Sequence, residues 1–205
     1  MWTKRLLMAA FVAAFTFPAF AQAPAPAGTP IHVRGTIEKF DGKVLAVKSR
    51  EGQQAAITLA DKLTLKTVKG FRLSRIKQGD YVGISSITDA SGKMQAQEIV
   101  VLPEAMRGVA EGQFPWDLSS GSTMTNATVA QVAKVKRNRE LQLTYKGGTA
   151  DIAVAPGTPV VTFVDATARS LKPGKAVFVS GRKMDDGSIV SGFVVVQRGK
   201  VKPPL

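Results

Sequence analysis

Apolar and polar residues alternate along most of the chain after its first 30 residues. The alternation is clearest where Ile57 and Leu59 fall on one face and Thr58 on the other. A period of two is typical of a strand with one buried face. The strand-like runs are separated by Asp41-Gly42 and Glu51-Gly52, which are signals for tight turns between paired strands. The pattern therefore predicts short antiparallel strands.

The predicted elements fall into two groups in the same order. The first group has strands at residues 33–40, 44–49, 55–59 and 63–68, a short helical turn at 73–79, and strands at 81–88 and 94–102. The second group has strands at 128–135, 141–145, 150–154 and 160–164, a turn at 170–174, and strands at 176–182 and 189–197. Each group thus contains about six short strands and one short helix.

The two groups are repeats of one another. Residues 76–84 align with 171–179 and residues 91–101 with 186–196, both at an offset of 95, and residues 36–40 fall on 131–135 at the same offset. Two copies at a constant offset indicate duplicated domains. Closure into a barrel removes the exposed edges of so few strands. We therefore predict an all-β chain of two tandem OB-like antiparallel β-barrels, with a flat sandwich as the alternative.

The ends of the chain differ from the repeats. Residues 1–23 have a basic start, a short apolar run and an Ala21-Gln22-Ala23 exit, which is the pattern of a secretory signal peptide. A Pro/Ala-rich leader follows at 24–30, and a basic tail occupies 199–205. The expected domains are therefore repeat one at 31–102, repeat two at 127–198 and a linker at 103–126. The expected location is the periplasm, with no transmembrane span in the mature chain.

The linker combines loop-forming residues with bulky apolar ones. Glycine, proline and hydroxyl residues are frequent in it, but it also contains Phe114, Trp116 and Leu118. A loop this long with apolar anchors is usually functional or packed across its neighbours. We predict an ordered linker with a groove around Met106, Trp116 and Met124, and the sequence leaves open whether that groove is a ligand site or an inter-domain seam.

Charge adds a second feature. The chain carries +13, and loss of Lys4 and Arg5 with the signal peptide leaves +11. Residues 31–102 have 12 basic and 7 acidic residues, and residues 127–198 have 11 basic and 5 acidic ones, so the excess lies on both repeats. Such surfaces attract polyanions. The candidate anion-binding residues are Lys66, Lys69, Arg72, Arg75, Lys77, Lys134, Lys136, Arg137 and Arg139. The alternative is that these residues form ordinary solvent-exposed surfaces that bind no particular ligand.

The sequence gives little support for catalysis or for metal binding. The chain has no Cys, and His32 is its single His, so nucleophilic schemes lose their usual base and no two-His metal site can form within one chain. The mature methionines are spread along the sequence, and only Met106 and Met124 share the linker. We predict no enzyme activity, no catalytic residues, no metal-ligating residues and no cofactor, and the sequence leaves open whether any metal is bound. Export also argues against a nucleic acid ligand.

Several segments of the linker and of the second repeat resemble those of a known family. They are residues 103–108 (PEAMRG), 111–112 (EG), 115–118 (PWDL), 122–129 (STMTNATV) and 145–148 (YKGG). Here the chain resembles a proteobacterial family of exported two-repeat proteins with OB-like domains of unknown function. Members often carry the label of a metal ABC transporter permease, which conflicts with this sequence because it lacks the spans that a permease requires. The resemblance implies the fold and the compartment, and it implies no activity or site residues.

These observations lead to one functional hypothesis and two alternatives. The first is a non-catalytic periplasmic binding or envelope module whose basic face meets an anionic envelope component or an envelope protein. One alternative is a metal-handling accessory protein of the periplasm that uses the Met106 and Met124 thioethers. The other is a purely structural assembly protein.

Overall fold

The fold is all-β, as the alternation predicts. The computed structural model describes residues 27–135 and 138–204, and within them the chain forms twelve strands and three single-turn 3-10 helices. The predicted signal peptide, the first part of the leader, Lys136 and Arg137 lie outside the described residues. In the described part of the chain, no helix is long and apolar enough to cross a membrane.

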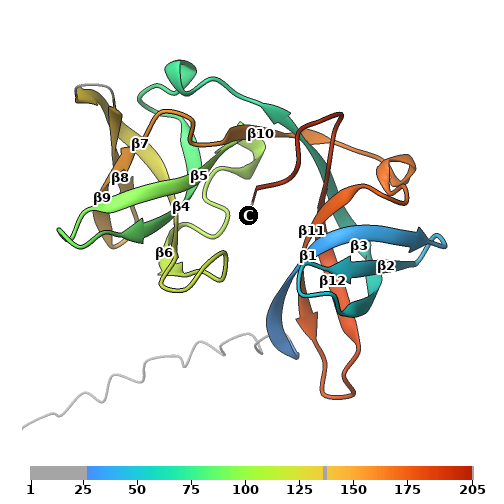
Figure 1. Ribbon diagram of the computed structural model, residues 1–205. Helices are drawn as coiled ribbons and strands as arrows, with labels where there is room; N and C mark the ends of the chain where they lie inside the picture. The colour runs from blue at the N-terminus through green and yellow to red at the C-terminus, as the bar shows by residue number, and fades with distance from the viewer. Residues whose placement is uncertain (1–26, 136–137, 205) are drawn as a thin grey trace, which may run out of the picture.

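The strands gather in two lobes (Figure 1). One lobe holds β1 (Thr29–Phe40), β2 (Val44–Ser49), β3 (Gln54–Gly70), β11 (Ala176–Lys183) and β12 (Ile189–Val196). The other holds β4 (Tyr81–Thr88), β5 (Met94–Leu102), β6 (Gly112–Pro115), β7 (Thr123–Val135), β8 (Asn138–Tyr145) and β9 (Gly148–Val154). The remaining elements are β10 (Val160–Asp165), which joins the lobes, and the 3-10 turns η1 (Leu73–Arg75), η2 (Glu104–Met106) and η3 (Ala168–Ser170).

Five strands close into a barrel, here called the first barrel. Their order is β1-β2-β3-β12-β11, and β11 pairs back to β1. All neighbours are antiparallel except β3 and β12, which are parallel. The inward-facing residues of these strands, together with Leu171, form a core that includes Leu45, Val47, Ile57 and Val194. The period-two alternation of the sequence is thus the alternation between barrel interior and exterior.

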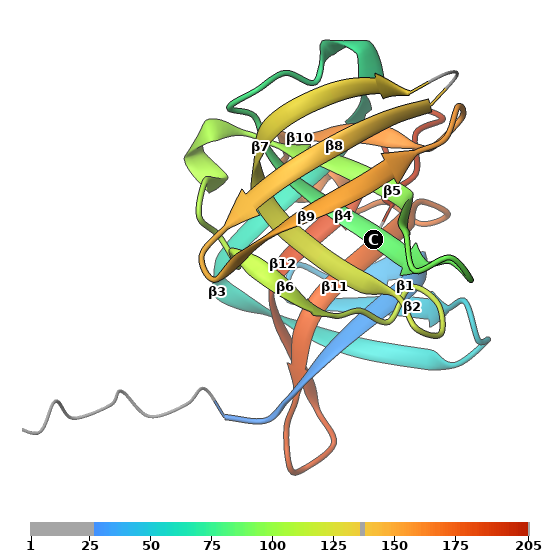
Figure 2. The ribbon, with the colours of Figure 1, turned by 90° about the vertical axis from the view of Figure 1, so that its left-hand side faces the viewer.

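The pairing of five other strands also closes, in what we call the second ring. Its order is β4-β5-β9-β8-β7, with β7 pairing back to β4 (Figure 2). The closing ladder between β5 and β9 is parallel and has only two residue pairs, Met94 with Ile152 and Gln95 with Ala153. A separate core that includes Ile84, Ile99 and Leu141 fills this ring.

The prediction of two tandem barrels is not confirmed, because the two repeats exchange halves. The first barrel takes β1–β3 from residues 31–102 and β11–β12 from residues 127–198. The second ring takes β4–β5 from the first repeat and β7–β9 from the second. Each closed unit therefore combines strands from both predicted repeats.

The long strand β3 pairs with β10 at the centre of the molecule, and this pairing connects the two lobes between which the predicted repeats are divided. The sequence predicts a break near Asp61, but β3 is one strand that continues to Gly70 and pairs there with β10. In this ladder Val161 lies opposite Gly70, and Asp165 lies opposite Lys66. Because β3 runs on instead of turning back, the following segment enters the other lobe, where the Gly79 amide donates to the carbonyl of Val129. The connection between β3 and β4 therefore sends the second half of repeat one away from its first half.

The strand pairing also corrects one part of the repeat alignment. In the first barrel Phe178 lies opposite Arg34, and in the second ring Gly83 lies opposite Asn126. Phe178 and Gly83 are 95 positions apart, whereas Arg34 and Asn126 are 92 apart. The alignment of residues 36–40 with 131–135 is therefore wrong by three residues.

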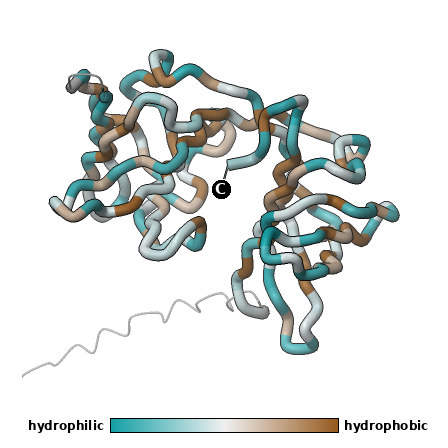
Figure 3. The backbone as a smooth tube through the Cα atoms, in the orientation of Figure 1, coloured by the Kyte–Doolittle hydropathy of each residue, from teal (hydrophilic) through white to brown (hydrophobic). Residues whose placement is uncertain are grey.

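Several strands are apolar on both faces. In β12, Val194 and Val196 face the core of the first barrel, whereas Phe193 and Val195 face outward. These outward residues join others, such as Val100 of β5 and Phe163 of β10, in a third apolar cluster between the lobes. Hydrophobic stretches accordingly follow the strands of both lobes, and the turns are mostly hydrophilic (Figure 3). The uninterrupted apolar runs of the sequence are strands that are buried on both faces.

The predicted linker, leader and tail contain regular or packed structure. The linker contains η2 and the short strand β6, which pairs with β7, and β7 itself begins at Thr123 inside the predicted linker. β1 begins at Thr29 within the predicted leader. In the predicted basic tail, Pro203 and Pro204 are buried. The strands therefore begin earlier than predicted at Thr29 and Thr123, and part of the tail is packed.

Candidate ligand-binding cleft

A cleft of about 840 Å³ lies between the first barrel and the second ring. The first barrel contributes Pro30, His32, Thr64, Lys66, Phe178, Ser180 and Phe193, and β10 contributes Phe163. The second ring and the linker contribute Gly83, Val100, Leu102, Ala105, Met106, Val109, Ala110, Phe114, Pro115, Trp116, Met124 and Asn126. Most of these side chains are apolar, and the volume is within the ordinary range for small-molecule sites.

Side chains alternate between the inside and the outside of the barrel along β1 and β11, and the outward-facing ones form the first-barrel wall of the cleft. In β1, Ile31 and Val33 belong to the barrel core, so His32 and Arg34 face outward. In β11, Val177 and Val179 face the same core, so Phe178 faces outward beside the β1 residues. Because Phe178 is paired directly with Arg34, the guanidinium carbon of Arg34 lies 5.2 Å from the centroid of the Phe178 ring.

Several aromatic rings line the cleft on this side. Phe163 and Phe193 meet edge to face with centroids 5.9 Å apart. His32 stacks on Phe178 at 5.5 Å. The linker adds Trp116, whose ring centroid lies 4.3 Å from that of His32. This last contact crosses the boundary between the linker and the first barrel, so it helps to fix the position of the linker.

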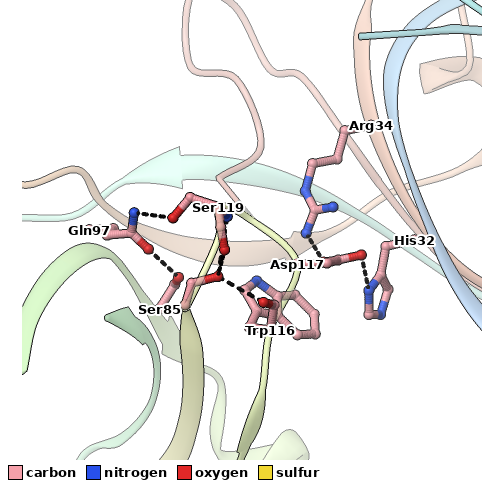
Figure 4. A network of polar contacts seen from close by, with 8 residues as sticks. His32, Arg34, Ser85, Gln97, Trp116, Asp117 and Ser119 are labelled. Atoms are coloured by element: carbon pink, nitrogen blue, oxygen red, sulfur yellow. Dashed lines mark hydrogen bonds and ion pairs between the residues drawn. The ribbon is translucent and has the colours of Figure 1, made fainter. Parts of the chain in front are cut away.

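Asp117 binds the linker to β1 through charge. One carboxylate oxygen accepts a hydrogen bond from Arg34 Nη2 at 2.7 Å, and the other lies 3.0 Å from His32 Nδ1. Figure 4 shows the Asp117 carboxylate between these two side chains, with the Trp116 ring beside them. Burial raises the pKa of Asp117, but the hydrogen bond and charge of Arg34, together with His32, outweigh it and hold the pKa below its ordinary value.

The same linker segment is tied to the second ring on its other side. Gln97 of β5 donates to the Ser119 hydroxyl at 2.9 Å and accepts from Ser85 at 3.1 Å (Figure 4). The Ser122 hydroxyl lies 2.8 Å from the carbonyls of both Trp116 and Ser119. Residues 116–122 therefore bridge the first barrel and the second ring, and we call this segment the clasp.

One polar atom of the clasp has no partner. Trp116 Nε1 is buried, and no hydrogen-bond acceptor among the described residues reaches it. A buried N–H group without an acceptor costs free energy that a bound acceptor would recover.

The predicted groove residues come together. Met106, Trp116 and Met124 all line the cleft, and Met124 is almost fully buried. The sequence analysis missed His32, Arg34, Asp117 and Phe178 as a group. The period-two pattern signals only that His32, Arg34 and Phe178 face outward from their strands. Nothing in the sequence shows that the linker covers that face.

The predicted anion-binding residues are not assembled in one place. In β3, Lys66 lines the cleft and forms an ion pair with Asp165, whose side chain is 91% exposed. Lys69, Arg72, Arg75 and Lys77 are exposed around η1. Lys134 and Arg139 face each other near the tip of the β7–β8 hairpin. The end of β7 and η1 lie on the same side of the molecule in Figures 1 and 2.

A second basic site comes from residues that were not predicted. A pocket of about 400 Å³ near η3 is lined by Arg169, Lys172, Lys175 and Arg198, and also by Asp165. Arg169, Lys172 and Lys175 lie close together in the sequence before β11, and the fold adds Arg198, which follows β12.

Within the described residues, no three His, Asp or Glu side chains come close enough together to hold a metal ion. Comparison with protein-family models, with curated proteins and with solved structures finds no match for this chain.

Proposed function

We propose that the chain is a non-catalytic binding module of the periplasm, and that it binds an anionic envelope component whose apolar part lies in the cleft. The observation that carries this proposal is an apolar cleft of about 840 Å³ in a protein with a formal charge of +13. An apolar pocket favours hydrophobic ligands, and a strongly basic surface raises the local concentration of anions. An anionic amphiphile satisfies both conditions.

The strand order supports an OB-like assignment for both units. In the first barrel, β1–β3 are antiparallel, β3 is parallel to the last strand β12, and β1 pairs with β11. The second ring has the same pattern when its strands are counted from β7, with β4 and β5, which come earlier in the chain, as the fourth and fifth strands. This order fits a five-stranded Greek-key barrel of the OB type, a class that often serves as a binding module. The exported location remains a proposal that rests on residues 1–23.

Trp116 provides the readout for a direct test. A chain that starts at residue 24 contains Trp116 as its single tryptophan, and that ring lines the cleft. We expect lysophosphatidylglycerol, which is anionic, to change the Trp116 fluorescence at lower concentration than zwitterionic lysophosphatidylcholine. The difference should shrink as salt is added, because salt screens exposed charges.

A matched pair of variants locates the binding site. Met106→Glu introduces a negative charge into the cleft wall and should weaken lysophosphatidylglycerol binding by roughly tenfold. Ile87→Glu makes the same kind of change at a residue that is 37% exposed and outside the cleft lining, and it should leave binding unchanged. Equal binding by the two variants, with both folded by circular dichroism, would place the ligand elsewhere.

One observation supports the alternative that the protein handles metal ions. Met106 and Met124 line the same cleft as His32, and thioethers and imidazole are ligands for Cu(I). Titration with Cu(I) should then give one equivalent of bound metal that is lost in the Met106→Leu, Met124→Leu double variant. Absence of tight binding to the unmodified chain would remove this alternative.

A further inference from the structure

The pocket near η3 gathers basic side chains at a place that the cleft does not include. It measures about 400 Å³, and it shares no lining residue with the cleft. Among the residues that line it, only Asp165 is acidic. Its four cationic lining residues are Arg169, Lys172, Lys175 and Arg198. Four positive charges and one negative charge leave the lining with a net charge of +3.

These four cations are not neutralised by neighbouring carboxylates. Within residues 27–135 and 138–204, the ion pairs involve only the basic residues His32, Arg34, Lys66 and Arg107. Asp165 itself is paired with Lys66, whose side chain lines the cleft. Charges of one sign in a concave surface raise the local potential, because the low-dielectric walls focus the field. The pocket therefore attracts anions.

The segment before β11, which carries three of the four cations, is fixed to the first barrel. Leu171 lies within this segment and is buried in the core of that barrel. The Gly174 amide donates to the Ile37 carbonyl at 2.8 Å, and the Ile37 amide donates to the Lys175 carbonyl at 2.9 Å. The segment is thus held against β1.

A tight turn after β12 carries the fourth cation. Arg198 and Val201 exchange two backbone hydrogen bonds, each of 3.0 Å. The Gln197 side chain accepts from the Ala176 amide at 3.0 Å and donates to the Gly199 carbonyl at 2.8 Å, which ties the turn to β11. Because both segments are already held in place, binding an anion requires little ordering of the backbone, and this lowers its cost.

We propose that this pocket binds a ligand with two adjacent phosphate groups, which is the chemistry of a diphosphate. A phosphate monoester carries about −1.5 to −2 near neutral pH, and a diphosphate concentrates more negative charge against the +3 of the lining. The guanidinium groups of Arg169 and Arg198 can each donate two parallel hydrogen bonds to phosphate oxygens, and the lysines add point charges. This site is separate from the cleft, so it does not rest on the proposed function of the cleft.

Calorimetric titration of the chain starting at residue 24 with sodium diphosphate tests the proposal. Diphosphate should bind at a one-to-one ratio and about tenfold more tightly than inorganic phosphate at low salt, and added salt should weaken it. The Trp116 fluorescence should not change, because Trp116 lines the cleft and not this pocket. Absence of diphosphate binding at low salt would refute the site and would leave the proposed function of the cleft unaffected.

Substitutions of exposed side chains locate the site. Arg198→Gln and Lys172→Gln should each weaken diphosphate binding about tenfold, whereas Lys93→Gln, in the β4–β5 turn of the second ring, should change it less than about twofold. Asp165→Asn removes the negative charge from the lining and should tighten binding several-fold. Asp151→Asn, at an exposed acid of β9, is its control. Equal losses in Lys93→Gln and Lys172→Gln would show an effect of net charge alone and overturn the site.

A diphosphate group can reach the pocket as a soluble compound or as the head group of a lipid. Sedimentation with vesicles of nine parts phosphatidylcholine and one part diacylglycerol diphosphate distinguishes the two sources. Vesicle binding that is lost in Arg198→Gln would support the site with a lipid head group as its ligand. Vesicle binding that Arg198→Gln leaves intact, while binding of free diphosphate is lost, would support the site with a soluble ligand.

Discussion

The exchange of halves between the repeats predicts that neither repeat folds alone as a monomer. The perturbation is to divide the chain into residues 24–102 and 103–205, which cuts after β5. The first fragment keeps β1–β3 but loses β11 and β12, the two strands that close the first barrel. It also keeps β4 and β5 without the strands that complete the second ring.

The loss of stability in the first fragment can be estimated from the core residues that it lacks. Five of the twelve buried residues that form the core of the first barrel belong to the second fragment, namely Leu171, Val177, Val179, Val194 and Val196. Burial of one such side chain contributes about 1.5–3 kcal/mol, so the five together contribute roughly 8–15 kcal/mol. Whole domains are stable by only about 5–15 kcal/mol. The isolated first fragment should therefore be unfolded as a monomer.

Circular dichroism and size-exclusion chromatography with light scattering test this expectation. Each fragment alone should be unfolded or should form a homodimer, because a second copy can supply equivalent strands. An equimolar mixture should recover the near-ultraviolet spectrum of the intact chain. A monomeric 24–102 fragment with a cooperative thermal transition would refute the exchanged topology.

Three further predictions concern single residues. Gly35→Ala should lower the free energy of unfolding by about 3 kcal/mol or more in urea denaturation, because a Cβ at Gly35 would lie 2.1 Å from the Lys48 carbonyl oxygen; Gly70→Ala, with open space around it, is the control. Trp116→Ala should cost about 2–3 kcal/mol, since this partly buried ring contacts His32 and Phe178, and an unchanged melting temperature would contradict the clasp. The pKa of Asp117 lies below its ordinary value of 3.8, so its ion pair stabilises the fold fully above that pH and is lost as the pH falls through the folded-state pKa. The difference in melting temperature between the unmodified chain and Asp117→Asn should therefore be constant near neutral pH and disappear in strong acid, and a difference that grows on acidification would contradict this assignment.

The local elements could be predicted because their signals are local. The strands 44–49, 81–88 and 94–102 have the predicted limits. Gly42 and Gly92 adopt positive φ in the turns that join neighbouring strands, which is a conformation that glycine adopts without strain. The error at β3 has a physical origin as well. Asp61 and Lys62 are exposed polar residues that interrupt the alternation, and the strand continues through them because β12 and β10 supply partners further along.

The candidate cleft could be predicted only in part. Trp116 and the methionines stand out as bulky apolar residues in a long linker, and they do line the cleft. His32, Arg34 and Phe178 are ordinary outward-facing residues of their strands until a second surface covers them. Their significance depends on where Asp117 lies, 83 positions from Arg34 in the sequence.

The sequence by itself determined that this chain is built from strands, and it predicted two similar groups of strands, a basic surface and a linker with bulky apolar residues. The alternation of apolar and polar residues and the residues of the turns specify these features, because each of these signals depends only on residues that are close together in the sequence. Only the tertiary structure decided which halves of the repeats share a barrel and what lies between the two lobes. Both repeats present equivalent strand edges, so the choice among partners depends on the course of β3 and β10 through the centre of the molecule.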